Sequence, residues 1–299
     1  MLSFFVSLHI IFNMVRIMYS VDELEEGLFD LAFAEDIGDG DHTTLCCIPE
    51  DAVGRSQLLV KERGVLAGVE VARRIFKRFD STLRMETLLE DGALVSPGDV
   101  AFTVTGRVRS LLQTERLMLN VMQRMSGIAT MTRRYMDALK GTKTRVLDTR
   151  KTTPGMRVLE KEAVRIGGGV NHRMGLFDMI LLKDNHVDFA GGIAQALERC
   201  HEYLEAKGLD LKIEIEVRSF DELNTVLRVG GVDRIMLDNF SVEDTRKAVN
   251  LIDGRYETES SGGITLETIR GYAECGVDYV SVGALTHSVK GLDLSFKAV

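Results

Sequence analysis

The sequence predicts an α/β barrel preceded by a smaller α/β sandwich. After Lys140, strand-like runs alternate with helical stretches, an order typical of barrels and of doubly wound parallel sheets. The runs are almost continuously apolar or β-branched, as strands covered on both faces should be. They are residues 145–148, 179–182, 212–217, 234–237, 256–260 and 278–282. Before Lys140, short strands and helices lack this strict alternation, which favours a sandwich.

Size and composition limit the class of protein. The 299 residues, 45% of them hydrophobic and 27% charged, suit a soluble enzyme with two modest domains or one barrel and an appendage. A net charge of −8 argues against general binding to nucleic acid. The cysteines have no CxxC pair and no metal-ligand spacing, which fits a reducing cytoplasm, the location we expect. They are Cys46, Cys47, Cys200 and Cys275.

Residues 1–18 look foreign to the fold. Their apolar run, residues 4–12, is too short to span a bilayer, and no basic segment precedes it as in a secretory signal. Because Met14 and Met18 could each start the chain, we interpret the segment as an upstream extension, with a weak membrane-surface anchor as the alternative. We otherwise expect no membrane partner.

Two domains are predicted after this extension. The sandwich would comprise residues 19–113, with residues 288–299 as a candidate completion. The barrel would comprise residues 114–287 and carry the catalytic groups.

The sandwich elements follow one another closely. Apolar residues at helical spacing predict a helix from Val21 to about Ala32. Glycines at positions 38 and 40 favour a turn, so Asp41 and His42 are interpreted as turn residues rather than functional ones. The segment GVLAGVEVARRIFKRF supplies a helix, and SPGD a turn. Strands are expected at residues 56–60, 64–67, 83–88 and 100–106.

A long helix is predicted next, from Glu115 to about Leu139, with Thr114 as its N-cap. Apolar residues at helical spacing give it a stripe that would be buried. Arg116 would lie in the first turn, where a cation opposes the helix dipole unless an anion joins it. We therefore take Arg116 as a candidate ligand contact, with an ordinary surface arginine as the alternative.

Polar residues and glycines stand where the predicted barrel strands end. Barrel enzymes carry their chemistry on this rim and frequently bind phosphate at the last two loops, which here contain glycines. This agreement favours a barrel over a doubly wound sheet. The strand-end residues are Thr149, Arg150, Lys151, Lys183, Glu216, Asp238, Ser261, Gly262, Gly263, Gly283 and Ala284.

A basic segment runs through the first half of this rim. Residues 145–187 contain eight Lys and Arg residues in an acidic chain, which predicts a bound anion. A glycine triplet within the segment, residues 167–169, would let the NHR sequence approach the barrel centre closely. The candidate anion contacts are too many for one phosphate, so we expect several anionic groups in one cleft. These candidates are Arg150, Lys151, His172, Arg173 and Lys183.

Several rim residues allow a second interpretation. Lys183 could be a Schiff-base nucleophile, although with so many cations nearby we prefer an anion contact. Glu214 and Glu216 point to the same face of one strand, where substrate contact and structural ion pairing are about equally open. Asp238 could cap a helix. SGG alone is a weak phosphate signal, but its position after four charged strand ends strengthens it.

The motifs DTRKTTPGMR, GGGVNHRMGLFD, LLKDNH, MLDN, SSGGITLETI and VSVGALTHS occur in this order. With them, the chain from Val21 to the C-terminus resembles the quinolinate phosphoribosyltransferases, also called nicotinate-nucleotide pyrophosphorylases (carboxylating). The resemblance implies an open, TIM-like α/β barrel with an N-terminal α/β sandwich. It also implies a homodimer in which one subunit's sandwich helps to close the other's site, with a hexamer left open. Ser260 departs from the family, which more often has Ala before SGG.

The reaction implied by the resemblance joins quinolinate to 5-phosphoribosyl-1-pyrophosphate and releases pyrophosphate and CO2, leaving nicotinate mononucleotide. The two carboxylates of quinolinate and the phosphates of the donor match the predicted cations. By resemblance, quinolinate would be held by Arg116 of the partner subunit together with Arg150, His172, Arg173 and Lys183.

The resemblance also implies how the ribosyl donor is held. Thr149 and Lys151 would lie near it, while Glu216 and Asp238 would hold the ribose hydroxyls or Mg²⁺ on them. The 5′-phosphate would be received by Ser261, Gly262, Gly263, Gly283 and Ala284. The implied catalytic residues are Lys151, Lys183, Glu216 and Asp238. No residue is assigned as a direct metal ligand.

No organic cofactor is expected, because the ribosylated ring nitrogen can itself stabilise the carbanion left by decarboxylation, whereas Mg²⁺ is expected with the phosphates. Two alternatives remain at this point. One is a sugar-phosphate aldolase that uses Lys183 as a Schiff base. The other is a non-catalytic relative, such as the proteins associated with molybdenum transport, which would not need Glu216 and Asp238.

Overall fold

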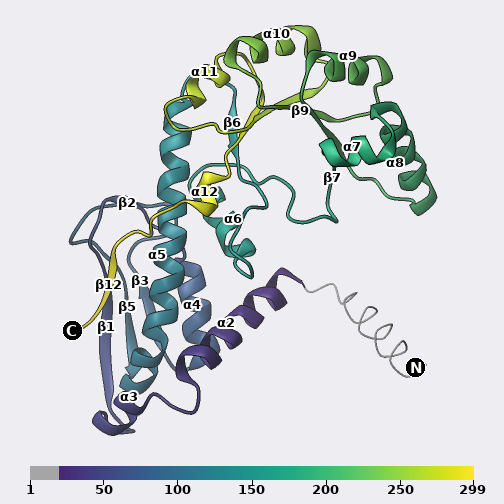
Figure 1. The fold of residues 1–299 in the computed structure, drawn as a ribbon. Helices are drawn as coiled ribbons and strands as arrows, with labels where there is room; N and C mark the ends of the chain where they lie inside the picture. Colours follow the sequence, from purple (N-terminus) through teal and green to yellow (C-terminus); the bar gives the residue numbers. More distant parts are fainter. Residues whose placement is uncertain (1–19) are drawn as a thin grey trace, which may run out of the picture.

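The computed structural model describes residues 20–299, and the predicted extension at residues 1–18 lies outside them. Figure 1 shows an antiparallel sheet with its helices, a curved parallel sheet, and one long helix that connects the two. Within the described chain, no helix combines the length and the apolar character needed to cross a membrane. The predicted fold class, an open α/β barrel with an N-terminal α/β sandwich, is confirmed.

The N-terminal sheet is antiparallel, with strand order β12-β1-β5-β3. Its strands are β1 (Val53–Val60), β3 (Arg84–Thr87), β5 (Val100–Arg107) and β12 (Leu294–Ala298), the last of which comes from the C-terminal end of the chain. A two-stranded sheet, β2 (Gly64–Val65) with β4 (Leu94–Val95), lies beside it. Helix α4 (Val69–Phe79) packs on α5, which follows β5. The ring of Phe76 lies 6.1 Å from the rings of both Phe102 and Phe296, so β12 contributes to this core.

The first helices differ in part from the predicted ones. Helix α2 (Val21–Ile37) forms where it was expected, and a capping box between Ser20 and Glu23 fixes its start. The prediction of a turn through His42 is wrong, because α3 (His42–Cys47) begins there. The Asp41 carboxylate accepts a hydrogen bond from the Thr44 N–H at 3.0 Å and thereby caps the helix.

Helix α5 (Val108–Ala138) begins earlier than predicted. Thr114 lies inside it, fully buried, and its hydroxyl donates to the Ser110 carbonyl, so the prediction of Thr114 as an N-cap is wrong. Arg116 is therefore beyond the first turn, and the helix-dipole argument for it does not hold. The predicted boundary between residues 113 and 114 falls within α5, and the division into domains stays a prediction.

The second sheet is parallel and has six strands in the order β6-β11-β10-β9-β8-β7. They are β6 (Arg145–Leu147), β7 (Ile180–Leu182), β8 (Ile213–Val217), β9 (Arg234–Asp238), β10 (Glu257–Ser261) and β11 (Tyr279–Ser281). The order places β6 and β7 at opposite edges. In the described chain these two strands do not pair, which leaves the barrel open. A single parallel bridge from Leu147 to Val170 extends the β6 edge.

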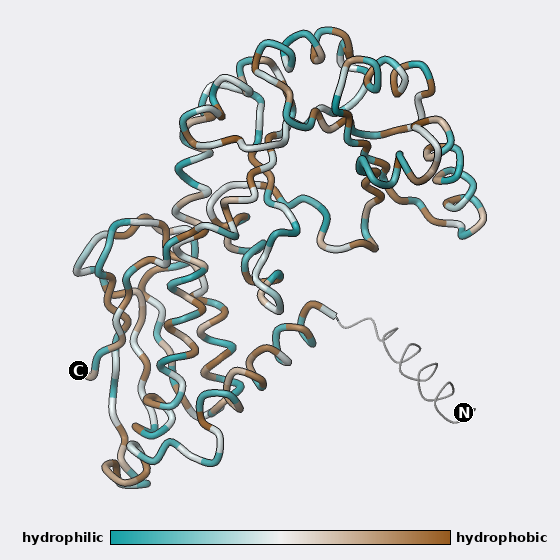
Figure 2. Tube along the Cα trace, in the orientation of Figure 1, coloured by the Kyte–Doolittle hydropathy of each residue, from teal (hydrophilic) through white to brown (hydrophobic). Residues whose placement is uncertain are grey.

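Four helices follow the outside of this curved sheet (Figure 1). They are α8 (Ile193–Lys207), α9 (Phe220–Val229), α10 (Val242–Ile252) and α11 (Ile269–Ala273). Helix α7 (Asp184–Ala190) packs on α8, while α6 (Arg157–Ile166) and α12 (Ala284–His287) pack on α5. Figure 2 shows hydrophobic residues concentrated along the strands and hydrophilic ones on the outer helix faces. One buried cluster extends from the sandwich through α5 to β11, and a second lies under β7, β8 and β9.

The glycine triplet after α6 has a packing role. A Cβ on Gly167 would lie 2.6 Å from the Ala129 carbonyl oxygen of α5, and one on Gly169 would lie 2.9 Å from Cγ2 of Thr132. The chain can therefore pass directly against α5 only because these residues lack side chains. This contact fixes the point from which the following residues enter the barrel.

Candidate active site

A cavity of about 760 Å³ opens at the carboxyl ends of the barrel strands. It is the location that a barrel enzyme uses for its chemistry. Every predicted rim residue lines it, and Arg116 alone among the predicted site residues does not. The predicted residues on its wall are Thr149, Arg150, Lys151, His172, Arg173, Lys183, Glu216, Asp238, Ser261, Gly262, Gly263, Gly283 and Ala284.

One wall of the cleft is basic. Its residues lie after β6 (Arg150 and Lys151), in the loop after α6 (Arg173) and at the end of β7 (Lys183). Arg150 and Lys151 are exposed, and within the described chain neither side chain forms an ion pair. Arg173 donates to the Met179 carbonyl at 3.2 Å, while burial, with Arg150 as a like charge nearby, lowers the pKa of Arg173. Lys183 lies 3.9 Å from the Glu216 carboxylate. These cations share one cleft, so it can hold more than one anionic group.

A buried ion pair supports this wall from behind. Lys161 and Asp148 are both fully buried and bonded to each other, and burial lowers the pKa of Lys161 and raises that of Asp148. Asp148 also accepts the His172 N–H at 2.8 Å, and Lys161 donates to the His172 carbonyl at 3.0 Å. The pair therefore holds the backbone of His172 from both sides.

The acidic wall is made by adjacent strand ends. Glu216 on β8 and Asp238 on β9 both line the cleft. Burial and the neighbouring Asp238 raise the pKa of Glu216, while Lys183 opposes that rise. Two carboxyl groups at this position suit contact with hydroxyl groups or with a developing positive charge.

The glycine loops form the remaining wall, after β10 and β11. Gly262 has φ +101°, and a Cβ there would lie 2.2 Å from Oδ1 of Asn239. The amide of Asn239 in turn donates to Asp238 at 2.7 Å. A Cβ on Gly283 would lie 3.2 Å from Cδ of Lys151. Both loops thus bring main chain close to side chains of the cleft, a close approach that glycine permits.

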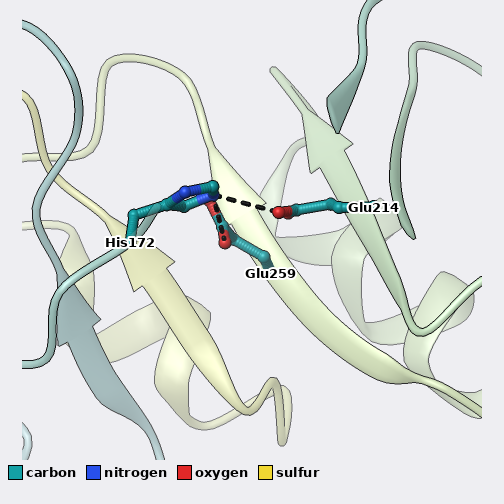
Figure 3. A group of neighbouring side chains, drawn as sticks. All are labelled: His172, Glu214 and Glu259. Atoms are coloured by element: carbon teal, nitrogen blue, oxygen red, sulfur yellow. Dashed lines mark ion pairs between the residues drawn. The ribbon is translucent and has the colours of Figure 1, made fainter. Parts of the chain in front are cut away.

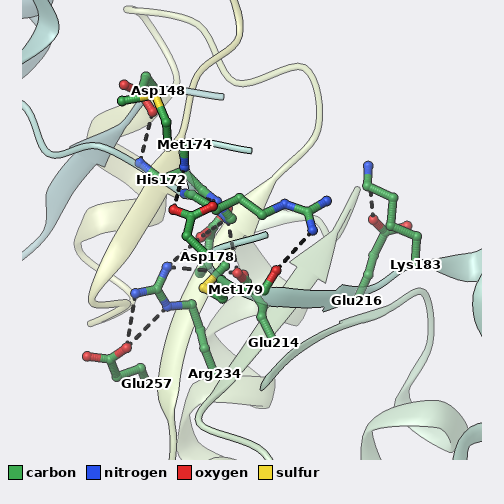
Figure 4. A network of polar contacts seen from close by, with 12 residues as sticks. Asp148, His172, Met174, Asp178, Met179, Lys183, Glu214, Glu216, Arg234 and Glu257 are labelled. Atoms are coloured by element: carbon green, nitrogen blue, oxygen red, sulfur yellow. Dashed lines mark hydrogen bonds and ion pairs between the residues drawn. The ribbon is translucent and has the colours of Figure 1, made fainter. Parts of the chain in front are cut away.

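A cluster of buried charged groups, which the sequence did not predict as a unit, extends from the wall of the cleft into the barrel. Nε2 of His172 is 3.0 Å from a Glu214 oxygen and 3.6 Å from a Glu259 oxygen (Figure 3). Arg234 lies 3.0 Å from Glu257 (Figure 4). It also lies 3.3 Å from Glu259, and its guanidinium stacks over the Tyr279 ring. Burial raises the pKa of Glu214 to about 7 and that of Glu259 to about 8, and it lowers the pKa of His172. Glu214 is thus in an ion-pair network and is not among the lining residues of the cleft.

Comparison with known proteins agrees with this geometry. The family described as "Quinolinate phosphoribosyl transferase, N-terminal domain" matches residues 41–126, and the one described as "Quinolinate phosphoribosyl transferase, C-terminal domain" matches residues 128–297. The chain belongs to the quinolinate phosphoribosyltransferase family.

Individual relatives of this family are similar over most of their length. Quinolinate phosphoribosyltransferase [decarboxylating] 1b of Nicotiana tabacum is 45% identical over 91% of this chain and 81% of its own. The probable nicotinate-nucleotide pyrophosphorylase [carboxylating] of Bacillus subtilis is 41% identical, covering 88% of this chain and 89% of its own. The NadC crystal structure from Streptococcus pyogenes is 40% identical with a TM-score of 0.85, and the match covers 91% of this chain and 96% of that one.

For two residues, the prediction and the lining of the cleft in this member of the quinolinate phosphoribosyltransferase family differ. Arg116 is exposed on α5 and does not reach the cleft of its own chain. Glu259, in contrast, lines the cleft and was missed. A signal for it existed, since Glu259 stands two residues before Ser261 on a strand and so shares its face.

Proposed function

We propose that this protein is a quinolinate phosphoribosyltransferase that makes nicotinate mononucleotide, pyrophosphate and CO2 from quinolinate and 5-phosphoribosyl-1-pyrophosphate, a step of de novo NAD biosynthesis. The observation that carries the proposal is the single cleft that joins the basic wall, the acidic wall and the glycine loops. A dianionic acid and a phosphorylated, pyrophosphorylated sugar need these three features together.

The basic wall would bind quinolinate through Arg150, Arg173 and Lys183, with His172 beside them. In the first step the ring nitrogen forms a bond to the anomeric carbon of ribose, and the bond to pyrophosphate breaks. Positive charge develops at that carbon, and Glu216 and Asp238 at adjacent strand ends would stabilise it and hold the ribose hydroxyls.

The donor's phosphates would lie along the other side of the cleft. Thr149 and Lys151 are proposed near the pyrophosphate, while the two glycine loops receive the 5′-phosphate. The loops follow β10 and β11, which are neighbours in the sheet, so their main chains lie together on the rim. The receiving residues would be Ser261, Gly262, Gly263, Gly283 and Ala284.

Decarboxylation would follow on the same bound ring. Loss of CO2 leaves an electron pair on the carbon beside the ribosylated nitrogen, and that cationic nitrogen stabilises the pair until a proton arrives. The chemistry therefore requires no organic cofactor, and we propose none.

We propose Mg²⁺ as the metal that accompanies the donor. The donor set fits it, because Glu216 and Asp238 put two carboxyl groups side by side in the cleft, and their mutual repulsion favours a cation nearby. The ion would pair with the donor's phosphates, near these two carboxyls.

We propose further that the protein acts as a homodimer in the cytoplasm, with assembly into a hexamer left open. The position of Arg116 supports a dimer, because an exposed arginine far from its own cleft can complete a partner's cleft. Among the similar proteins, some plant ones are named chloroplastic or mitochondrial, so cell fractionation is the test of location.

The function is tested by mixing protein, Mg²⁺, quinolinate and the ribosyl donor and measuring nicotinate mononucleotide and CO2. Nicotinate in place of quinolinate is the control, and we expect it to be ignored, because it lacks the carboxyl that is lost. Absence of product from quinolinate, or equal use of nicotinate, would contradict the proposal. A chelator should abolish turnover, and added Mg²⁺ should restore it.

The aldolase alternative is disfavoured by the surroundings of Lys183. Its side chain is 49% exposed and faces a carboxylate, whereas a Schiff-base lysine is activated by desolvation or by another cation. Borohydride treatment with a sugar phosphate should therefore give no adduct. The alternative of a non-catalytic, anion-binding relative is also disfavoured, because such a protein would not need Glu216 and Asp238 in the cleft.

A further inference from the structure

His172 lines the cleft, but both of its ring nitrogens lie against protein groups. Nδ1 accepts the N–H of Arg173 at 2.7 Å, so the ring proton of a neutral imidazole stands on Nε2. Nε2 faces Glu214 at 3.0 Å and Glu259 at 3.6 Å. Only 6% of the side chain is exposed. Nε2 is fully buried and, among the described residues, makes no hydrogen bond of acceptable geometry, so its contact with the two carboxyl groups is electrostatic. Because the atom is buried, it does not face a ligand in the cleft.

The buried groups around Nε2 comprise more carboxyl groups than cations. One guanidinium, that of Arg234, faces two fully buried carboxyl groups, at 3.9 Å from Glu214 and 3.3 Å from Glu259. Glu257, also bonded to Arg234, is partly exposed and can be solvated. An unpaired buried charge is costly, so one proton shared by Glu214 and Glu259 balances the set. The raised pKa values of both carboxyls agree with this sharing.

The groups that face this cluster come from every side of the barrel interior. Ser281 on β11 lies beside Glu259 and lowers its pKa against the larger effect of burial, and Arg173 lies near Glu214. Lys161 and Asp148 hold the backbone of His172. The ring is thus fixed through its own backbone, and its Nε2 edge lies against the two carboxyl groups without a hydrogen bond.

We propose that Glu214, Glu259 and Arg234 are positioning residues that hold the His172 ring so that Nδ1 fixes the backbone of Arg173. Arg173 is thereby aimed into the cleft at the ligand's carboxylates. His172 then acts on quinolinate through Arg173 and not through a ring nitrogen. This inference rests on the proposed function for its ligand, and on the contacts of His172 for its geometry.

The decisive comparison is between two replacements of His172. His172→Asn places an amide oxygen where Nδ1 stands and can still accept the Arg173 N–H. His172→Gln reaches the position of Nε2 and leaves that N–H without its acceptor. We expect Asn to raise the KM for quinolinate only a few-fold and Gln to raise it at least about tenfold, with the KM for the ribosyl donor unchanged in both. Equal effects, or better function in Gln, would overturn the proposal.

The acid pair is tested by replacing its members one at a time and together. Glu214→Gln or Glu259→Gln alone leaves one carboxylate for Arg234, so we expect changes below about threefold in the KM for quinolinate. The double variant Glu214→Gln/Glu259→Gln leaves Arg234 without a fully buried counter-charge, and we expect that KM to rise at least about tenfold. If either single variant matches the double one, the shared-proton arrangement is wrong. Thermal unfolding of each variant confirms that it is folded.

Nitrogen-15 NMR of the histidine rings gives a readout that does not depend on turnover. We expect a neutral His172 with its proton on Nε2 in the wild type, and loss of this tautomer preference in the double Gln variant. A ring protonated on Nδ1 would overturn the inference. So would a tightly bound metal ion, retained by the wild type and lost in Glu259→Gln, because His172, Glu214 and Glu259 are close enough together to hold one. If the wild type fails to use quinolinate, the proposed function fails, while the tautomer still decides the geometry.

Discussion

The side-chain oxygen of Asn239 occupies the place that a Cβ at position 262 would need. The separation would be 2.2 Å, far below van der Waals contact, and Asn239 itself adopts φ +57°. The end of β9 therefore packs directly against the loop after β10. The side-chain amide of Asn239 also donates a hydrogen bond to Asp238, so Asp238 is part of the same packed arrangement.

Gly262→Ala should for this reason damage binding of the ribosyl donor. We expect its KM to rise at least about tenfold, while binding of quinolinate, on the opposite wall, changes little. Gly208→Ala is the matched control, because Gly208 also has positive φ, +61°, but a Cβ there meets nothing within 4 Å. The control should lose about 1 kcal/mol of stability and no activity. A donor KM unaffected in Gly262→Ala would remove this loop from the phosphate site.

Arg150→Ala and Lys183→Ala should each lower kcat/KM by roughly tenfold to a few hundredfold, because each removes a charge-assisted contact worth about 1.5–3 kcal/mol. Steady-state kinetics with quinolinate measures the loss. Arg165→Ala is the control, since Arg165 pairs with Glu162 on the surface of α6 and does not line the cleft. Unchanged rates in both test variants would exclude these residues from the site.

Arg116→Ala should abolish most activity if Arg116 serves the partner's cleft, and mixing experiments can show this. An Arg116→Ala subunit paired with a Lys183→Ala subunit would have one cleft with both defects and one intact cleft. Refolding the two weakened variants together should raise activity to about a quarter of the wild-type value, since half of the dimers are mixed and each of these has one intact cleft. Recovery of none would mean that Arg116 acts in its own chain or not at all.

The free energy of unfolding should fall as the pH rises from about 6.5 to about 8.5. The folded-state pKa values of Glu214, about 7, and Glu259, about 8, lie above the ordinary value of 4.5, so in this window the folded protein binds more protons than the unfolded chain. Deprotonation of Glu214 and Glu259 in the folded protein therefore lowers its free energy of unfolding. Urea unfolding at several pH values measures this, and Glu214→Gln/Glu259→Gln should flatten the dependence. Stability that rises with pH in both proteins would contradict it.

The barrel and its rim could be predicted because their signals are local. Each parallel strand is short, apolar and followed by a polar residue or a glycine, and strand ends of a parallel sheet meet at one edge. This is why Lys183, Glu216 and Asp238 line one cleft, although they come from different strands.

The start of α5 and the partners of the buried acids Glu214 and Glu259 could not be predicted in the same way. Strand β5 runs straight into α5, and the N-cap Arg107 makes no side-chain capping bond, so no sequence signal marks the start, whereas Thr114 resembles a cap that it does not form. Glu259 is stable inside the barrel only because Arg234 and His172, distant in sequence, reach it. Such pairing is tertiary, and a single strand does not reveal it.

The pairing of β12 with β1 bears on how this protein matures. Strand β12 follows the whole barrel in the chain, yet it supplies Phe296 to the core built by the first hundred residues. The N-terminal sheet consequently remains one strand short until β12 has been translated and has left the ribosome. A nascent chain must keep that exposed edge from aggregating in the meantime, and a truncation that removes β12 would leave the edge permanently exposed.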